Sequence, residues 1–241
     1  MFEFDNAFDL IIFIIEIIGC LSFGTSGAIK AIRSKTDILG VWVLTLFEAF
    51  GGGLIRDLII SEYPPFIIWN KEYHLLALVI IVVSLVWFII AYNKKTAHFI
   101  EKHRHDRWIY YVDAVGIAAF CVAGCEIAQK WVPAEAGTIG THVFVVTLGV
   151  VTGVGGGMLR DVIMGRIPSV FQKHFYMTPC IIGCLIHSIM IFIGAEYIIS
   201  SIVCFSIIII LRFLAIKFEW NLPVAKGYNE LIENIDKDKT S

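Results

Sequence analysis

Long apolar runs separated by short polar segments dominate the chain. A helix needs about 20 mostly apolar residues to cross a bilayer, and seven runs are long enough. They lie near residues 9–29, 38–60, 74–92, 109–129, 139–163, 174–194 and 197–216. The last two are divided only by Gly194, Ala195 and Glu196. The pattern predicts an all-α integral membrane protein with seven transmembrane helices.

A duplicated motif divides the chain into two related halves. GGGLIRD at 51–57 returns as GGGMLRD at 155–161, an offset of 104 residues. The same offset relates two further pairs, Asp9 with Asp113 and Pro64 with Pro168. Each half contains three spans, and because three is odd, the second half enters the membrane from the opposite side. This predicts an inverted 3+3 repeat plus a seventh helix, as in many transporters and channel-like proteins.

The repeat defines the expected organisation of the chain. We expect the first three-helix repeat in residues 1–92, a basic cytoplasmic linker in 93–108 and the second, inverted repeat in 109–194. The seventh helix follows at 195–216, and a polar cytoplasmic tail occupies 217–241.

The basic residues predict how the spans are oriented. Fourteen of them lie in the loops 30–37, 93–108 and 164–173 and in the tail after 216. The opposite loops hold only Lys71 and Lys130. Since cytoplasmic loops carry the excess of Lys and Arg, we expect the N-terminus outside and the C-terminus in the cytoplasm.

Three consecutive glycines inside an apolar span lower the stability of a helix there. Glycine is about 1 kcal/mol less favourable than alanine in a helix, and non-helical backbone at membrane depth survives only where it is buried in protein or lines a cavity. One interpretation is a tight packing surface between helices. The other interpretation is packing together with a kink or break that lines a pathway. In that case the pathway is lined by Gly51, Gly52, Gly53, Gly155, Gly156 and Gly157.

An arginine and an aspartate follow each triple glycine. Neighbouring side chains on a helix diverge by about 100°, so Arg56 and Asp57 are not expected to pair with each other, nor are Arg160 and Asp161. Unpaired charges are costly in a membrane. We therefore expect Arg56 to reach Asp161 or another polar group across the interface between the repeats, and Arg160 likewise to reach Asp57. The charges predict either a polar constriction that gates or selects, or a structural salt bridge between the repeats.

Glu48 lies one helical turn before the first triple glycine, and its equivalent in the second repeat is Thr152. Acids inside spans are functional candidates by default, and one beside a helix break would attract cations. We include Glu48 and Thr152 in the candidate pathway. Glu16 and Glu126 also lie inside spans, either as functional acids or as hydrogen-bond partners of a neighbouring helix.

Other polar positions receive structural interpretations. Lys30 is assigned to the loop after the first span, and Arg212 is expected to extend to the cytoplasmic surface. Asp113 opens the fourth span, where a carboxylate favours the helix N-terminus. His187, alone in the sixth span, is expected to be a hydrogen-bonded buried histidine.

Composition narrows the function class. The chain is 58% hydrophobic and 17% charged, whereas soluble chains are nearer one quarter charged. A net charge of −2 suggests no nucleic-acid partner. The sequence holds no GxSxG, HExxH or phosphate-binding loop, so we expect neither an enzyme nor a cofactor. The six cysteines lie in apolar segments without CxxC spacing, which predicts buried packing residues rather than disulfides or metal ligands.

Two GGGxxRD motifs, inverted repeats and a seventh helix resemble the trimeric intracellular cation (TRIC) channels, specifically their prokaryotic homologues. The resemblance covers roughly residues 5–216. It implies a homotrimer with one pore per protomer, lined by kinked second and fifth helices at glycines 51–53 and 155–157. The implied permeant ions are chiefly K⁺, with Na⁺ as a further candidate. It also implies a multi-pass protein of the plasma (inner) membrane, in contact with membrane lipids.

The chain departs from animal members of that family. Its fourth span has no lysine before Lys130 and its tail is short, so phosphoinositide regulation is not expected. The bacterial group has also been described as glycine transporters. A secondary transporter of a small neutral amino acid, with Glu48 carrying a coupling proton, is therefore the alternative to a K⁺ channel. A non-transporting membrane scaffold is the third interpretation.

Overall fold

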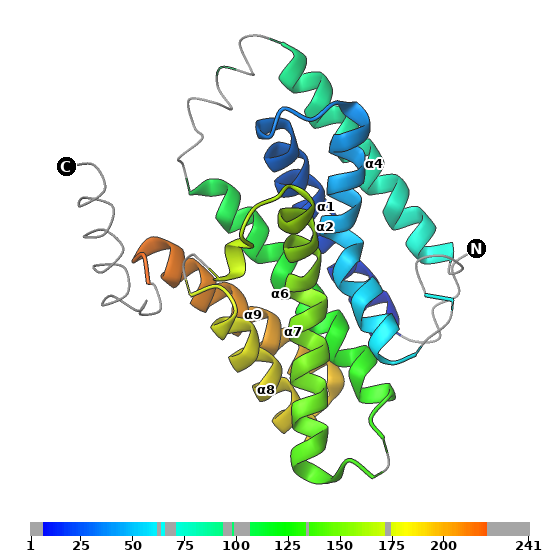
Figure 1. Ribbon diagram of the computed structural model, residues 1–241. Coiled ribbons are helices and arrows are strands. Elements are labelled where there is room, and N and C mark those ends of the chain that lie inside the picture. Colours follow the sequence, from blue (N-terminus) through cyan, green and yellow to red (C-terminus); the bar gives the residue numbers. More distant parts are fainter. Residues whose placement is uncertain are drawn as a thin grey trace, which may run out of the picture.

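The computed structural model describes residues 7–61, 64–65, 71–93, 98, 107–133, 135–171 and 175–220. This part of the chain is a bundle of α-helices with one 3-10 helix (Figure 1). The helices are α1 (Ala7–Arg33), α2 (Ile38–Ile59), α4 (Lys71–Tyr92), α6 (Trp108–Lys130), α7 (Gly137–Ile163), η1 (Ser169–Phe171), α8 (Thr178–Phe192) and α9 (Tyr197–Lys217). The predicted all-α membrane fold is confirmed. Most of the predicted linker 93–108 and of the tail lies outside the described residues.

Six of these helices are long and apolar enough to cross a membrane, while α8 has only 15 residues. Helix α8 begins within a few residues of the start predicted near residue 174, a position that lies outside the described residues. Phe175 has a positive φ of 48°, and Pro179 lies in the first turn of α8. Proline lacks a backbone N–H and is tolerated in that turn but not further into a helix, so α8 begins at Thr178. Its end is set by Gly194, whose φ is 87°.

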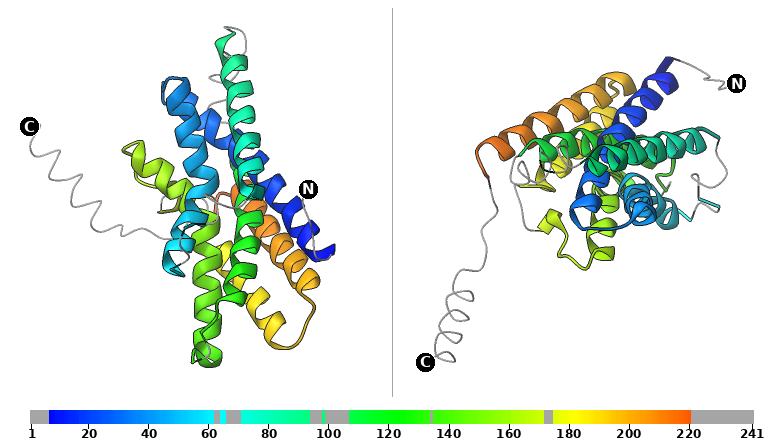
Figure 2. Two further views of the ribbon diagram at one scale, coloured as in Figure 1. Left: turned by 90° about the vertical axis from the view of Figure 1, so that its right-hand side faces the viewer. Right: turned by 90° about the horizontal axis from the view of Figure 1, so that it is seen from above.

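Helices α6 and α7 lie between α1, α2 and α4 on one side and α8 and α9 on the other (Figures 1 and 2). Helix α6 is the most enclosed span, and small residues such as Ala118, Ala119 and Gly124 make this possible. Without a hydrophobic effect between helices in lipid, close packing of small residues drives their association. All six cysteines are buried, as predicted for packing residues.

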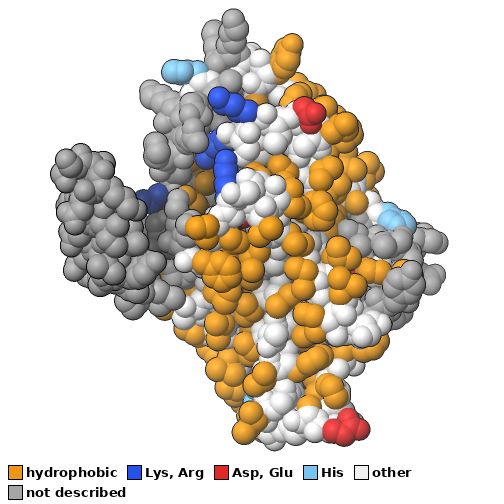
Figure 3. Space-filling view, in the orientation of Figure 1, with side chains coloured by type: hydrophobic (Ala, Val, Ile, Leu, Met, Phe, Trp, Pro, Cys, Tyr) orange, Lys and Arg blue, Asp and Glu red, His pale blue; other side chains and the backbone are white. Residues whose placement is uncertain are grey.

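The outer face of the bundle is apolar. Helix α4 exposes Leu75, Leu78, Val82, Val86 and Ile89, which recur every three or four residues and form one helical face. Figure 3 shows apolar side chains over most of the visible face, with lysines and arginines gathered near one end.

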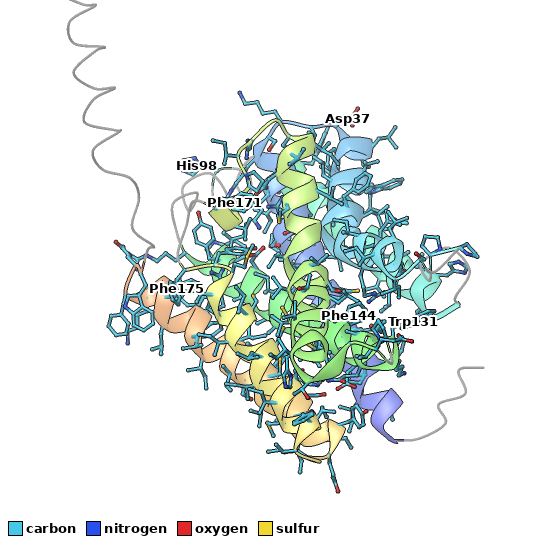
Figure 4. All side chains as sticks on the ribbon, turned by 60° about the horizontal axis from the view of Figure 1, so that its bottom comes forward. Asp37, His98, Trp131, Phe144, Phe171 and Phe175 are labelled. Carbon is cyan, nitrogen blue, oxygen red and sulfur yellow. The ribbon has the colours of Figure 1, made fainter. Side chains whose placement is uncertain are left out.

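Asp37 caps α2, and its Oδ1 accepts a hydrogen bond from Gly40 N at 2.7 Å (Figure 4).

Helices α2 and α7 touch backbone to backbone at their glycines. A Cβ built on Gly52 would overlap the carbonyl oxygen of Thr152, and a Cβ on Gly156 would overlap that of Glu48. The two contacts are equivalent in the duplicated sequence. Gly52 corresponds to Gly156 at the offset of 104 residues, and Glu48 corresponds to Thr152. Two copies related by a pseudo-two-fold axis would make such reciprocal contacts.

The glycines do not break either helix. Both α2 and α7 continue as α-helix through residues 51–53 and 155–157. This conformation shows the packing surface of the first interpretation, and no break interrupts either helix. Gly51, Gly52, Gly155 and Gly156 place no side chain between the helices, so the two backbones approach while their internal hydrogen bonds stay intact.

We predict that Gly156→Ala lowers the free energy of unfolding by about 1–3 kcal/mol, the usual cost of forcing extra atoms into a packed core. The new Cβ has no room beside the Glu48 carbonyl oxygen. Thermal unfolding in detergent measures the effect. The matched control is Gly53→Ala, where the nearest atom is Arg56 Nη2 at 3.6 Å and the better helix former should leave stability unchanged or raised. Equal melting temperatures for the two variants would contradict this packing role.

Candidate functional site

Six charged side chains gather inside the bundle, at the end where α1 and α7 end and α6 begins. We call them the charge cluster. Its members are Lys30, Glu48, Asp113, Arg160, Asp161 and Arg212. All except Lys30 are 5% exposed or less, and the Lys30 side chain is 16% exposed. Three cations and three carboxylates balance one another, as buried charges require.

Lys30 lies inside α1 and not in the loop to which the sequence assigned it. Its Nζ is 2.7 Å from Asp113 Oδ1 and 3.2 Å from Glu48 Oε1. Ser26 lies one turn earlier on the same face of α1, and its Oγ donates to Glu48 Oε1 at 2.7 Å. Because α1 continues to Arg33, Lys30 is carried into the bundle.

Each arginine of the repeated motif pairs with the aspartate that follows it, which corrects the expectation that neighbours do not pair. Arg56 donates from Nε and Nη2 to Asp57 Oδ1 at 2.8 and 2.6 Å. Arg160 makes the same two bonds to Asp161 Oδ1 at 2.9 and 2.5 Å. The long arginine side chain spans the angle between neighbouring positions and presents its fork of donors to one carboxylate.

The ion pair of Arg160 across the repeats involves Glu48 and not Asp57. Arg160 Nη1 is in direct contact with Glu48 Oε1. The helix crossing explains this choice, because Gly156 packs on the Glu48 backbone and Arg160 follows Gly156 by one turn. The other oxygen of Asp161, Oδ2, accepts bonds from the N and Oγ of Ser169 at 2.9 and 3.0 Å.

Asp113 is buried in the second turn of α6 and does not cap the helix. Its Oδ2 accepts a hydrogen bond from Tyr176 Oη at 2.6 Å. Arg212 is fully buried, with its guanidinium 4.1 Å from the centre of the Tyr176 ring, so the expected extension to the surface is wrong. A cation over an aromatic face is favourable and stronger when both groups are desolvated. Phe175 contacts Trp220 at 6.3 Å between ring centres and fixes the segment before α8 beside the end of α9 (Figure 4).

The six motif glycines fall into two groups. Gly51, Gly52, Gly155 and Gly156 are buried in the contact between α2 and α7. Gly53 and Gly157 are partly exposed and face more open space. A Cβ on Gly157 would lie 3.8 Å from Tyr176 Oη and 4.0 Å from Arg160 Nη2. Only the third glycine of each motif therefore borders space beside the arginine of its own motif.

Thr152, Glu126 and His187 form hydrogen bonds inside the bundle. Thr152 is buried, and its Oγ donates to the carbonyl of Leu148 at 2.6 Å. Glu126 Oε1 accepts from Ser201 Oγ at 2.5 Å and lies 3.0 Å from His187 Nε2. The prediction of a hydrogen-bonded buried His187 is confirmed.

Sequence reasoning missed the roles of Ser26, Lys30, Asp113, Ser169, Tyr176 and Arg212. A signal existed for one pair, because Ser26 and Lys30 are four residues apart and lie on one face of a continuing helix. Tyr176 and Ser169 lie between helices, and no local pattern marks their contacts with Asp113 and Asp161.

Comparisons with known proteins place the chain among bacterial membrane proteins and solved cation channels. A family model described as "Glycine transporter" matches residues 13–91 and 110–192. The UPF0126 membrane protein YvgT of Bacillus subtilis is 32% identical over 215 residues, which cover 87% of this chain and 94% of that protein. A solved TRIC cation channel has a TM-score of 0.73 at 32% identity, covering 91% of this chain and 97% of that chain. The TRIC orthologue from Rhodobacter sphaeroides has a TM-score of 0.72 at 26% identity, with 86% and 98% covered.

Fold and similarity together define a multi-pass α-helical membrane protein with the fold of the TRIC channels. The similar solved structures are channels and not enzymes. The chain belongs to the family whose model is described as "Glycine transporter", and it has the fold of the prokaryotic TRIC channels. The resemblance inferred from the duplicated motif is thereby confirmed.

We predict that Glu48→Gln lowers the free energy of unfolding by about 3–5 kcal/mol, the usual cost of breaking a buried ion pair. The change leaves the charges of Lys30 and Arg160 without their shared carboxylate. The matched control is Glu219→Gln, because Glu219 pairs with Arg107 where the two side chains are 60% and 42% exposed. Exposed pairs contribute about 0–1 kcal/mol. Chemical unfolding of both variants in detergent measures the difference, and similar losses would show that burial does not strengthen the Glu48 contacts.

Proposed function

We propose that the chain is a monovalent cation channel for K⁺, with a pore in each protomer at the crossing of α2 and α7. One observation carries the proposal. Buried charges and the open sides of Gly53 and Gly157 follow these two helices. Charges inside a membrane bundle are costly and therefore mark function by default. The similarity to solved TRIC cation channels supports the same function.

The proposed pathway has two constrictions, one in each repeat. Gly53 with the Arg56–Asp57 pair forms the first, and Gly157 with the Arg160–Asp161 pair forms the second. Each arginine is neutralised by its own aspartate, so a cation meets an ion pair and not an isolated positive charge. Near the glycines, backbone carbonyls and hydroxyls would replace part of the hydration shell of the ion.

Glu48 and Thr152 occupy the segment between the two constrictions in this proposal. Glu48 supplies negative charge that attracts cations, and its contact with Arg160 ties α2 to α7. We assign the described arrangement, with Arg160 held between Glu48 and Asp161, to a closed state.

We further propose a homotrimer in the plasma (inner) membrane, surrounded by lipid and open to K⁺ and Na⁺. The solved Rhodobacter sphaeroides orthologue is named as a trimeric channel, which supports self-association. The reciprocal glycine contacts support an inverted repeat with halves at 1–92 and 109–194. Removing Lys30 from the loop count leaves thirteen basic residues against two, which supports an outside N-terminus and a cytoplasmic C-terminus.

A secondary transporter of glycine is the second candidate, favoured by the description of the matching family model. The charge cluster contains both carboxylates and cations, the two groups that a zwitterionic amino acid would need. In this alternative Glu48 would carry the coupling proton.

One experiment separates the two candidates. Purified protein in proteoliposomes is assayed for K⁺ flux at a clamped potential and for labelled glycine uptake. A channel gives electrogenic K⁺ flux that glycine does not change. Saturable glycine uptake without K⁺ flux would replace the channel proposal with the transporter.

We predict that Gly157→Leu reduces K⁺ flux to the level of empty liposomes while the fold is preserved. The space beside Tyr176 Oη and Arg160 admits the new Cβ, and the rest of the leucine side chain fills it. Gly140→Leu is the matched control, since Gly140 lies near the far end of α7 with Ala136 Cβ as its only close neighbour, at 3.3 Å. Flux is measured on variants with the wild-type elution volume and melting temperature. Normal flux through folded Gly157→Leu would remove this glycine from the pathway.

A further inference from the structure

The ammonium of Lys30 sits among oxygen atoms contributed by three helices. Asp113 Oδ1 lies at 2.7 Å and Glu48 Oε1 at 3.2 Å from Nζ. Ser26 Oγ lies 2.7 Å from that same Glu48 oxygen and 3.4 Å from Asp113 Oδ1. We call these three oxygens the oxygen cage. An ammonium group and K⁺ are similar in size and charge, and both are bound by carboxylate and hydroxyl oxygens.

Glu48 has unused capacity to accept a cation. Its carboxylate is fully buried, and Oε2 has no hydrogen-bond partner among the residues that the structure describes. Oε2 lies against Gly27, where any side chain would overlap it. A buried carboxylate oxygen without a donor is costly, so the site favours additional positive charge.

The oxygen cage combines Ser26 and Glu48 of the first repeat with Asp113 of the second, and the residues that correspond to Ser26 and Glu48 do not repeat it. The residue that corresponds to Glu48 is Thr152, whose hydroxyl is bound to the Leu148 carbonyl. The residue that corresponds to Ser26 is Lys130, which is exposed at the end of α6. The duplicated fold therefore does not require the cage, and packing of the repeat does not explain it.

Lys30 is the removable part of this arrangement. Its side chain is 16% exposed, whereas Glu48 and Asp113 are at most 2% exposed. The tip of a flexible lysine side chain can leave, but the carboxylates are fixed by Arg160 and Tyr176. Withdrawal of the ammonium would leave buried negative charge that a free cation can neutralise.

We propose that Ser26, Glu48 and Asp113 form a binding site for a monovalent cation and that Lys30 is its tethered occupant. The ammonium and a cation from solution then compete for the same oxygens. This inference rests on the proposed channel function for its role in permeation, because the competing ion would be the permeating one. The binding itself is independent of flux.

The test is thermal unfolding of Lys30→Met in detergent across a K⁺ series, with N-methylglucamine keeping the ionic strength constant. Binding to the folded state alone raises the melting temperature. For the variant we expect a saturable rise on the order of 5 °C at saturating K⁺. We expect no K⁺ dependence for the wild type or for Lys130→Met, which removes an exposed lysine. Lys30→Met with Asp113→Asn should lose the K⁺ response.

Lys30→Gln provides a second variant, because its amide can still bond to the carboxylates if Lys30→Met does not fold. The proposal is overturned if the melting temperature of a folded Lys30→Met or Lys30→Gln variant does not change with K⁺ concentration. Failure of both to fold even in high K⁺ also overturns it, since a filled cage would restore the missing charge. Absent K⁺ flux in wild-type liposomes would instead reject the channel and leave the melting series unaffected.

Discussion

The backbone contact between α2 and α7 determines the geometry on which the rest of the structure depends. Gly52 packs on the Thr152 carbonyl and Gly156 on the Glu48 carbonyl, with no side chain between the helices. In lipid, such contacts must provide the association that the hydrophobic effect provides in water. Because this crossing fixes where Glu48 and Arg160 meet, it also fixes the charge cluster.

The charge cluster is stable only as a balanced set. Its three cations and three carboxylates come from α1, α2, α6, α7 and α9, so the network connects most of the bundle. Removing charges from water is expensive, and their mutual attraction offsets this cost only when every group is paired. The same network that holds the helices together therefore supplies the polar groups that an ion pathway needs.

Duplication gave the two halves the same motif but not the same surroundings. Both arginines pair with their own aspartates, yet Arg160 also contacts Glu48, whose place in the other repeat is taken by Thr152. A symmetric scaffold thus carries an asymmetric set of charges. In the proposed channel, the two constrictions would therefore differ in their charged neighbours.

The sequence by itself determined the all-α membrane fold and the duplicated GGGxxRD motif, and it drew attention to the triple glycines and Glu48, which the structure places at the contact between α2 and α7. Span length and a fixed offset can be read along one dimension. Only the tertiary structure decided that the helices stay unbroken, that Arg160 meets Glu48, and that Lys30 and Arg212 lie inside the bundle. The physical reason is that a charged side chain takes its partner from whichever helix crosses its own at that level. The crossing depends on packing between segments 100 residues or more apart, and no local pattern encodes it.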